Sequence, residues 1–352
     1  MTRVALHVGQ LLQPVPGGIG TYVRALVRAL PAAGVDLTTF ATGTPGNLTG
    51  PHVELGPPRG SLRYECWHRL RWPSVRIPSD VVHAPSLAVP PTRTPLVVTI
   101  HDVAFLRYPA MFTARGVRFH ERGLELARRH AAAIITPSHF TRDELIREGF
   151  DGTRVRVAQH GAPPADALFT DPQADAATLT SVGIGGPFVL AVGTIEPRKR
   201  FDVAAAAAGA IDGITLVIAG PRGWNDVPGL DAPHVRLLGT VDAPTLASLY
   251  RTAAAAVVPS EYEGFGLPAL EAMAHGCPVI TSDAQSLVEV AGDAGVVAPV
   301  GDVDAWRAAI ASVLDDPEHR AQLARAAIRR AGAFTWSESA RIHAETYSAV
   351  AH

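Results

Sequence analysis

Two glutamates bracket a glycine-containing turn in the second half of the chain. Glu263 and Glu271 stand on either side of the tripeptide Gly264-Phe265-Gly266, with seven residues between them. The short apolar run 255–258 before the pair predicts a β-strand, and the apolar pattern 267–274 predicts a helix. A turn of this kind leaves backbone N–H groups free at the helix start, where the helix dipole adds partial positive charge. A phosphate group fits such a turn.

A carboxylate does not bind phosphate, but it accepts hydrogen bonds from the hydroxyl groups of a sugar. One carboxylate before a phosphate-binding turn and one after it therefore suit a nucleotide sugar. The alternative is that both glutamates are solvated surface charges, and Glu271 argues against it because it lies in an otherwise apolar helix. We expect Glu263 to bind the hexose and Glu271 to bind the ribose. The predicted donor-binding turn comprises Gly264, Phe265, Gly266 and Leu267.

Two cations follow an earlier predicted strand, at 189–192. The turn after this strand reads Gly193-Thr194-Ile195-Glu196-Pro197-Arg198-Lys199. Cations at the start of a helix oppose the helix dipole, so a bound anion would explain their presence. A solvated basic turn is the alternative. Arg198 and Lys199 are therefore candidates for contacts with a phosphate.

Two further candidates lie in the first half of the chain. Gly17-Gly18 stands between the first predicted strand, 4–8, and a predicted helix, 19–30, without the G-x-G-x-x-G pattern of a dinucleotide-binding turn. His101 follows the predicted strand 97–100, at the carboxyl end that ligands of such sheets approach. A histidine held by structural hydrogen bonds is equally consistent with that position.

Together these motifs resemble those of the retaining glycosyltransferases of family 4. The segment 263–281 is similar to the family's E-x7-E motif and to the A-x-G-x-P-V segment that follows it. The turn 193–199 is similar to the family's V-G-x-x-x-P-R-K element, and Gly17-Gly18 to its G-G-[IV]-[GE] loop. The resemblance covers nearly the whole chain and is strongest from about 188 to 301.

The resemblance implies a role for each candidate. Lys199 would contact the donor diphosphate, Gly17-Gly18 would donate backbone N–H groups to it, and His101 would lie near the anomeric centre of the donor sugar. Many members carry an arginine where this chain has Thr194. Arg198 would then supply the second positive charge, unless one lysine and backbone amides hold the diphosphate. The catalytic set implied in this way is Lys199, Arg198, Glu263 and His101.

Strands that alternate with helices must position these residues. Further strands are predicted at 37–41, 81–83, 134–136, 215–219, 235–238 and 279–281, with helices after most of them. Such alternation predicts α/β domains with parallel sheets covered by helices on both faces. We expect two doubly wound, Rossmann-like domains, 1–165 on the acceptor side and 188–335 for the nucleotide sugar. The resemblance implies the GT-B fold, in which two such domains face each other across a cleft.

Two segments fall outside this alternation. Residues 166–187 are predicted to be a linker, because the surrounding stretch is rich in proline and glycine and has little periodic pattern. Residues 336–352 form a final helical pattern, for which the sequence indicates no packing partner.

Composition excludes several classes of function. The 352-residue chain is 47% hydrophobic with a formal net charge of −2, which gives no sign of nucleic-acid binding. Its two cysteines, Cys66 and Cys277, stand far apart and fit neither a disulfide framework nor a metal-ligand cluster. We expect no bound metal and no cofactor. The nucleotide sugar is a co-substrate, and fixed charges and dipoles would take the role that a metal often has.

We expect a cytoplasmic protein, because no apolar run reaches the roughly 18 residues of a membrane span and no secretory signal is evident. The segment 62–76 mixes arginines with tryptophans at roughly helical spacing. It would suit peripheral contact with a membrane surface or an anionic lipid-linked acceptor, or else it is an ordinary amphipathic helix whose arginines extend into water.

Trp224 stands where the family's nucleotide base usually packs. It would contact the base or cap its own loop.

The sequence therefore predicts a retaining, metal-independent hexosyltransferase. It would move sugar from a nucleoside-diphosphate donor, GDP-mannose by the resemblance, to a hydroxyl group of a saccharide, lipid-linked or small-molecule acceptor. Two alternatives stay open. One is an epimerase of nucleotide sugars on the same fold, which needs no acceptor, and the other is a catalytically silent protein that binds the sugar nucleotide. The oligomeric state is also left open.

Overall fold

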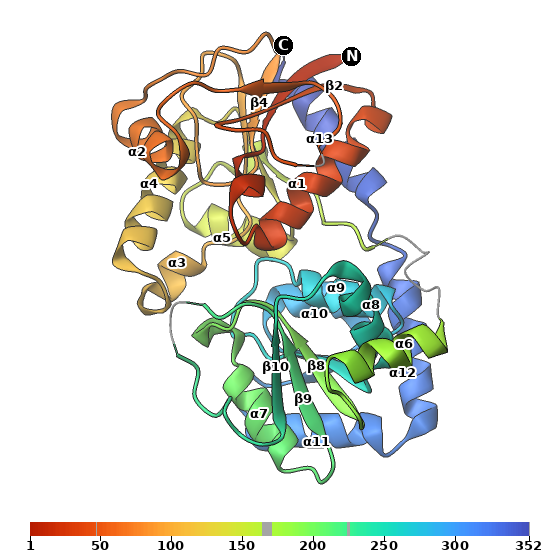
Figure 1. Cartoon of the computed structure of the whole chain (residues 1–352). Coiled ribbons are helices and arrows are strands. Elements are labelled where there is room, and N and C mark those ends of the chain that lie inside the picture. The colour runs from red at the N-terminus through yellow and green to blue at the C-terminus, as the bar shows by residue number, and fades with distance from the viewer. Residues whose placement is uncertain (47, 164–170, 224–225, 352) are drawn as a thin grey trace. The chain divides into compact units, whose positions relative to one another are not determined.

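The computed structural model describes residues 1–46, 48–163, 171–223 and 226–351 (Figure 1). The chain forms two compact units. One consists of Met1–Gly161 together with Thr335–His352, and the other of Ala162–Phe334. Each unit is built on one parallel β-sheet that is covered by helices, which confirms the predicted fold class.

The sheet of the first unit has seven strands in the order β3-β2-β1-β4-β5-β6-β7, and every neighbouring pair is parallel. The strands are β1 (Thr2–His7), β2 (Val35–Ala41), β3 (His52–Glu54), β4 (Val81–Ala84), β5 (Leu96–Thr99), β6 (Ala133–Thr136) and β7 (Val155–Val157). The α-helices are α1 (Gly17–Ala29), α2 (Gly60–Leu70), α3 (Ala104–Arg107), α4 (Ala114–His130), α5 (His139–Arg147) and α13 (Trp336–Val350). The strand order reverses between β1 and β4, and ligands of such sheets bind beyond the carboxyl ends of the strands at this switch point.

The sheet of the second unit has six strands in the order β10-β9-β8-β11-β12-β13, again all parallel. The strands are β8 (Phe188–Val192), β9 (Thr215–Ala219), β10 (Val235–Gly239), β11 (Ala255–Val258), β12 (Val279–Ser282) and β13 (Val296–Ala298). The α-helices are α6 (Pro172–Ser181), α7 (Phe201–Gly209), α8 (Ala243–Thr252), α9 (Leu267–Ala274), α10 (Gln285–Ala291), α11 (Val303–Leu314) and α12 (Pro317–Ala331). Here the switch point lies between β8 and β11.

The four inner strands of the second sheet, β9, β8, β11 and β12, are buried on both faces, which explains their almost continuous apolar sequences. Successive side chains of a strand point to opposite faces. In β8, Leu190 therefore packs into one hydrophobic cluster, while Val189 and Ala191 pack into the other. Met273 of α9 belongs to the first cluster and Trp306 of α11 to the second, so helices cover both faces of the sheet.

Every predicted strand is present, with each end within two residues of its predicted position. The structure adds β3, β7 and β13, which the sequence did not reveal. Each of them has three residues and lies at an edge of its sheet. A strand of three residues is too short to show a period of two.

The predicted linker 166–187 is in part a helix, so the expectation of an irregular connection was wrong for 172–181. Helix α6 begins after Asp171, whose side chain accepts hydrogen bonds from the backbone N–H groups of Gln173 and Ala174. Asp175 of α6 pairs with Arg251 of α8, and their side chains are only 6% and 13% exposed. The helix is therefore an integral part of the second unit. The rest of the expected linker includes 166–170, which lie outside the described residues.

The final helix, α13, belongs to the first unit. Its Ala340 and Tyr347 are fully buried in the hydrophobic cluster that includes Val4 of β1 and Leu26 of α1. The first unit thus runs to Gly161 and resumes at Thr335, whereas the sequence had placed the domain ends at 165 and 335. The packing partner that the sequence left open is the sheet of the N-terminal unit.

Candidate donor-binding site

Two turns meet at the switch point of the second sheet. One follows β8 and contains Arg198 and Lys199, and the other follows the neighbouring strand β11 and contains Glu263. The backbone N–H of Glu261 donates to the carbonyl oxygen of Arg198 over 2.9 Å, so the turns are joined directly. Strand order therefore brings together residues that are 64 positions apart in the chain.

Glu263 lies at the centre of a nearly buried ionic cluster. Lys199 Nζ donates to Glu263 Oε1 over 2.5 Å, and Arg198 Nη1 donates to Oε2 over 3.2 Å. The side chains of Lys199, Glu263 and Arg198 are only 11%, 10% and 13% exposed. Arg198 also pairs with Glu196. The structure thus brings together three of the four charged candidates of this unit, and the fourth, Glu271, lies elsewhere.

The two cations set the protonation state of Glu263. Burial alone would raise the pKa of its carboxyl group. The charges of Lys199 and Arg198 outweigh burial, and hydrogen bonds from Lys199 and Ser260 add to them, so the pKa of Glu263 falls to about 2. Glu263 is therefore an ionised acceptor throughout the neutral range. An ionised carboxylate is the form that accepts hydrogen bonds from sugar hydroxyls most strongly.

Three serines, which the sequence did not single out, hold this carboxylate in place. Ser260 Oγ donates to Glu263 Oε1 over 2.7 Å, and Ser286 Oγ donates to the backbone carbonyl of Glu263 over 2.6 Å. Ser282, at the end of β12, donates in turn to the carbonyl of Ser260 over 2.5 Å. All three serines are buried. One feature could have pointed to these serines, because Ser282 lies at the carboxyl end of β12, the strand next to β11.

The glycine turn takes the form that the sequence predicted. Gly266 precedes α9 with φ +112°, a region that favours glycine, and a Cβ atom there would lie 2.5 Å from Leu287 Cδ2. No side chain caps the start of α9, and no acidic residue lies in its first turn. Within the described parts of the chain, the N–H groups of Gly266 and Leu267 have no hydrogen-bond acceptor. Those amides can donate to an anion.

The side chain of Phe265 lies in the core of the second unit. Its side chain is only 4% exposed and packs against Phe334 in the core, with the ring centroids 6.0 Å apart. The phenyl ring of Phe265 is therefore part of the core of the second unit. The physical reason is that the apolar ring gains more from burial in the core than from a place beside a phosphate.

Glu271 stands apart from the ionic cluster. It is the fifth residue of α9, and Tyr250 of α8 donates to its Oε2 over 3.2 Å. Burial raises the pKa of Glu271 to about 7, although the Tyr250 hydrogen bond lowers it in part. Tyr250 is itself buried, and its ring stacks on His275 with the centroids 5.3 Å apart. The sequence did not identify Tyr250, because a lone tyrosine in an amphipathic helix carries no distinguishing signal.

The first unit holds the remaining predicted residues. Helix α1 begins at Gly17, which has φ +60°, and the preceding Pro16 supplies no side-chain cap. His101 Nε2 lies 3.0 Å from the carbonyl oxygen of Pro85. A carbonyl only accepts, so Nε2 carries the proton and Nδ1 is the acceptor of the neutral ring. Burial lowers the pKa of His101 and keeps the ring neutral.

A buried polar network joins His101 to the final helix, and the sequence gave no hint of it. The ring of Tyr22 contacts that of His101 edge-on at 4.9 Å, and the Tyr22 hydroxyl lies 2.7 Å from both Thr99 Oγ1 and His343 Nε2. His83 Nε2 lies 2.8 Å from Thr99 Oγ1, and the hydroxyl of Tyr347 lies 2.7 Å from His83 Nδ1. These residues come from α1, β4, β5 and α13, so no local pattern could announce them.

An Asp-x-Asp triplet, 302–304, has a spacing that could hold a metal ion and so bears on the expectation of no metal. Asp302 caps α11 by accepting from the N–H of Ala305, and Asp304 pairs with Arg307 while its side chain is 91% exposed. The triplet is accounted for as a helix start. Across the described ranges, no group of three His, Cys, Asp or Glu side chains is arranged to hold a metal ion.

Two other sequence-based expectations concern aromatic residues. Trp224, the expected base contact or loop cap, lies outside the described residues. In the segment 62–76, Trp67 is fully buried, whereas Trp72 follows the end of α2 and is 59% exposed. No helix within the described ranges is long and apolar enough to span a membrane.

Comparisons with known proteins match both units. The model of Glycosyltransferase Family 4 matches residues 16–166, and that of Glycosyl transferases group 1 matches residues 182–330. O-antigen chain mannosyltransferase B of Escherichia coli is 34% identical over 270 residues, which cover 73% of this chain and 71% of that protein. The chain belongs to the group 1, family 4 glycosyltransferases.

Relatives and solved structures of this glycosyltransferase agree on its architecture. D-inositol 3-phosphate glycosyltransferase of Jonesia denitrificans is 28% identical over 97% of this chain and 93% of that protein. HepE of Anabaena, solved with UDP and glucose, aligns over 99% of this chain and 100% of that chain with a TM-score of 0.77 and 19% identity. Sucrose-phosphate synthase of Thermosynechococcus elongatus aligns over 99% of both chains with a TM-score of 0.76 and 22% identity. The fold of this chain is GT-B, and the family uses nucleotide sugars.

Proposed function

We propose that this glycosyltransferase transfers a hexosyl group from a nucleoside-diphosphate sugar to a hydroxyl acceptor, with retention of anomeric configuration and without a bound metal. The observation that carries the proposal is the buried cluster of Lys199, Arg198 and Glu263 at the switch point of the second sheet. A buried ion pair is weak evidence for stability, because desolvation of its charges offsets their attraction. A ligand with both an anionic part and hydroxyl groups accounts for its presence.

The cluster can serve both parts of such a donor. An ammonium group has three N–H donors, and among the described residues the ammonium of Lys199 bonds to Glu263 alone. The other two N–H groups remain for a diphosphate, together with the amides of Gly266 and Leu267. Glu263, ionised and fixed by Ser260, accepts from hexose hydroxyls.

The leaving diphosphate gains negative charge as the glycosidic bond breaks. A fixed ammonium and free helix-start amides stabilise that charge more strongly in the transition state than in the bound donor, which is what accelerates a reaction. We assign the same role to the amides of Gly17-Gly18 at the uncapped start of α1. His101 is assigned to the anomeric region of the donor sugar, as a neutral ring with Nδ1 as acceptor. No side chain is assigned as a nucleophile.

We further propose GDP-mannose as the donor and a saccharide, a lipid-linked saccharide or a small molecule as the acceptor. The motifs of the turn after β8 support mannose, and the name of the Escherichia coli relative, a mannosyltransferase, supports it independently. UDP-glucose is the main competing donor, because HepE was solved with UDP and glucose.

The deciding experiment is a hydrolysis and transfer screen over nucleotide sugars in excess EDTA. We expect release of nucleoside diphosphate, fastest from GDP-mannose, at an unchanged rate after chelation. Loss of activity with EDTA that Mg²⁺ or Mn²⁺ restores would refute metal independence. The anomeric configuration of a transfer product, read by NMR, tests retention.

The same screen separates this proposal from the two alternatives. An epimerase would convert the donor alone into an epimer, without any acceptor. A silent binding protein would bind the nucleotide in calorimetry but release no diphosphate from any donor. We expect neither result.

A further inference from the structure

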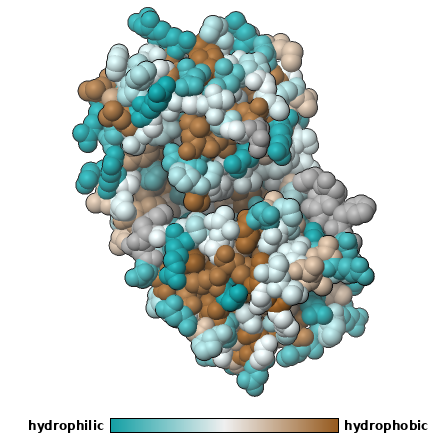
Figure 2. All heavy atoms as spheres, viewed as in Figure 1, coloured by the Kyte–Doolittle hydropathy of each residue, from teal (hydrophilic) through white to brown (hydrophobic). Residues whose placement is uncertain are grey.

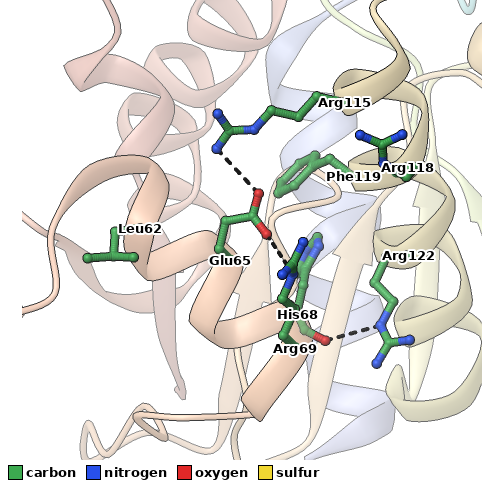
Figure 3. Close-up of a pocket in the computed structure, with 8 residues that line it drawn as sticks. All are labelled: Leu62, Glu65, His68, Arg69, Arg115, Arg118, Phe119 and Arg122. Atoms are coloured by element: carbon green, nitrogen blue, oxygen red, sulfur yellow. Dashed lines mark hydrogen bonds and ion pairs between the residues drawn. The ribbon is translucent and has the colours of Figure 1, made fainter.

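A groove of about 750 Å³ lies between α2 and α4 of the first unit, and its lining includes none of the residues assigned above. Half of its lining comes from each helix, and Figure 3 shows the two sets of side chains facing each other. The lining residues are Leu62, Glu65, His68 and Arg69 from α2 and Arg115, Arg118, Phe119 and Arg122 from α4. Hydrophilic and hydrophobic side chains are mixed along this edge of the first unit in Figure 2.

The charge of the groove is strongly positive. Four arginines face one carboxylate, Glu65, which pairs with Arg69 at 3.1 Å and with Arg115 at 3.3 Å. Burial lowers the pKa of His68 to about 4, so its ring is neutral and adds no charge. Two arginines are therefore left without a carboxylate partner.

Those two are Arg118 and Arg122, one turn apart on α4. Arg122 Nε donates to the carbonyl oxygen of His68 over 3.1 Å, which fixes the side chain but leaves its charge uncompensated. Arg118 makes no hydrogen bond or ion pair with any described residue, and no dashed line reaches it in Figure 3. Like charges one turn apart repel each other. A bound anion removes this cost.

The geometry of the donors favours one class of anion. Guanidinium groups present a planar fork of N–H donors that matches phosphate oxygens, often two at a time. The floor beside them is apolar, because the ring of Phe119 stacks on His68 with the centroids 4.4 Å apart. Leu62 at the rim is 61% exposed, and Leu70 and Trp72 beyond it are 69% and 59% exposed. An anion with an apolar neighbour fits this surface.

The helices of the groove cover the strand ends of the first sheet. His7, the last residue of β1, contacts Trp67 of α2 with the ring centroids 5.3 Å apart. On the other side, His120 of α4 stacks on Phe105 of α3 at 5.1 Å, and α3 directly follows His101 and Asp102. The helices that line the groove thus pack near the carboxyl ends of β1 and β5, the edge at which ligands of open α/β sheets bind.

We propose that this groove binds a phosphoryl group carried by the acceptor and thereby anchors the acceptor on the first unit. The inference rests on the proposed function, because it names the class of acceptor for that reaction. The phosphoryl group has two sources, a soluble sugar phosphate or the phosphate of a lipid headgroup. Both would engage the same guanidinium groups, Arg118 and Arg122 above all.

The test compares two pairs of substitutions on α4. Arg118→Gln with Arg122→Gln removes the two arginines that lack a carboxylate partner. Arg128→Gln with Arg129→Gln is the matched control, since it changes the net charge equally on the same helix, where both arginines pair with Glu125. Arg118→Gln alone guards against misfolding, because Arg118 has no hydrogen bond or ion pair with a described residue to lose. Arg118→Lys tests whether charge without the planar fork suffices. Thermal melts verify folding.

Two probes distinguish the sources. Calorimetry with glucose 6-phosphate measures soluble phosphate binding, and we expect the groove pair to weaken it about tenfold or more, as for loss of a charged hydrogen bond. Sedimentation with vesicles of phosphatidylglycerol and phosphatidylcholine, against phosphatidylcholine alone, measures headgroup binding. Phosphate binding at Lys199 would persist in the double variant Arg118→Gln, Arg122→Gln. The informative quantity is therefore the part of the binding that this double variant loses.

A loss of binding that occurs in the double variant Arg118→Gln, Arg122→Gln but not in the control variant supports the proposal. The probe that shows the loss, glucose 6-phosphate or the anionic vesicles, identifies the source of the phosphoryl group. The proposal is overturned if the control variant Arg128→Gln, Arg129→Gln loses binding equally. It is also overturned if neither glucose 6-phosphate binding nor vesicle binding depends on Arg118 and Arg122. Donor hydrolysis without acceptor is measured in parallel, and we expect the groove pair to leave it unchanged. If the wild type hydrolyses no nucleotide sugar, the proposed function fails while both binding arms still report on the groove.

Discussion

The candidate residues of the two units differ in charge and in how they are held. In the second unit, Lys199, Arg198 and Glu263 are charged and pair with one another in a nearly buried cluster. In the first unit, the hydrogen-bonded network beside His101 carries no charge, and its bonds join side chains across great sequence separations. The Tyr22 hydroxyl and its partner His343, for example, are 321 positions apart.

This difference indicates that the charged cluster serves ligand binding and that the neutral network serves stability. Charges that are desolvated together contribute little net stability, so the cluster of the second unit is best explained by its ligand. A fully connected neutral network instead rigidifies the elements that it joins, here α1, β4, β5 and α13. Substitutions in the cluster should therefore lower turnover or affinity, and those in the network should lower stability.

The largest expected effect is that of Lys199→Ala on turnover. Loss of one preorganised donor to a developing negative charge costs about 2.7–4 kcal/mol, or about 10²–10³ in kcat. Lys199→Arg should fall between the wild type and Lys199→Ala, because it keeps the charge in a different geometry. The measurement is kcat at saturating donor, with folding verified by thermal melt.

The control for this substitution is Arg200→Gln, which removes the next cation in the chain, one that pairs with Asp202 instead of Glu263. Its kcat should stay within a few-fold of the wild type. If Lys199→Ala behaves in the same way, the leaving-group role belongs elsewhere, and Arg198 becomes the leading residue for it.

A smaller effect is expected for Glu271→Ala on nucleotide affinity. Its carboxylate is expected to accept from the ribose, and one charge-assisted hydrogen bond contributes about 1.5–3 kcal/mol, so affinity should fall about 10- to 150-fold. Calorimetry with the free nucleoside diphosphate measures it. Glu261→Ala is the matched control, because Glu261 pairs with Arg200 at the surface. Unchanged affinity in Glu271→Ala would contradict the ribose assignment.

Tyr347→Phe tests the expectation that the neutral network of the first unit contributes to stability and not to turnover. It leaves Nδ1 of the buried His83 without its partner, which costs about 1–3 kcal/mol. We expect a lower melting temperature and a nearly unchanged kcat. Ser348→Ala, next to it on α13 and in an exposed hydrogen bond to Thr2, should change neither. A strong loss of kcat without a loss of stability would show that the network acts in the reaction.

The same contrast explains what could be predicted from the sequence. Lys199, Glu263 and Gly266 were found because each lies in a short motif directly after a strand, and chain-local patterns reveal such turns. Tyr22 and Tyr347 were not found, because their partners come from distant elements and single aromatic residues in apolar helices carry no signal. The three serines around Glu263 fall between these cases, since only the strand order shows that they converge.

The elements of the fold also differ in how well the sequence predicts them. Long buried strands have continuous apolar runs and were located within two residues, whereas the edge strands β3, β7 and β13 are too short for a pattern. Helix α6 was mistaken for a linker, because its order depends on an Asp171 cap and an Asp175–Arg251 ion pair instead of an apolar stripe. The position of α13 depends on contacts across the whole chain, which no local window contains.

The smallest expected effect is a pH dependence of nucleotide affinity that originates at Glu271. Burial raises the pKa of this carboxyl to about 7, and ribose hydroxyls bind best to its ionised form. Below pH 7 binding must first remove the proton, so affinity should rise by about tenfold between pH 6 and pH 8. The sign for folding is opposite. The unfolded carboxyl, with its ordinary pKa near 4.5, ionises first, so this group destabilises the fold as the pH rises from about 4.5 to 7.

The diphosphate itself titrates in this range, so the informative quantity is the difference between the wild type and Glu271→Gln, which cannot ionise. We expect calorimetry to show a flatter profile for Glu271→Gln. Tyr250→Phe provides a second check, because the Tyr250 hydrogen bond lowers the pKa of Glu271 and its removal should move the midpoint of the wild-type profile to higher pH. Identical profiles for all three proteins would mean that the ribose does not meet the Glu271 carboxylate. In that case α9 would contribute only its helix start to the donor site, through the amides of Gly266 and Leu267.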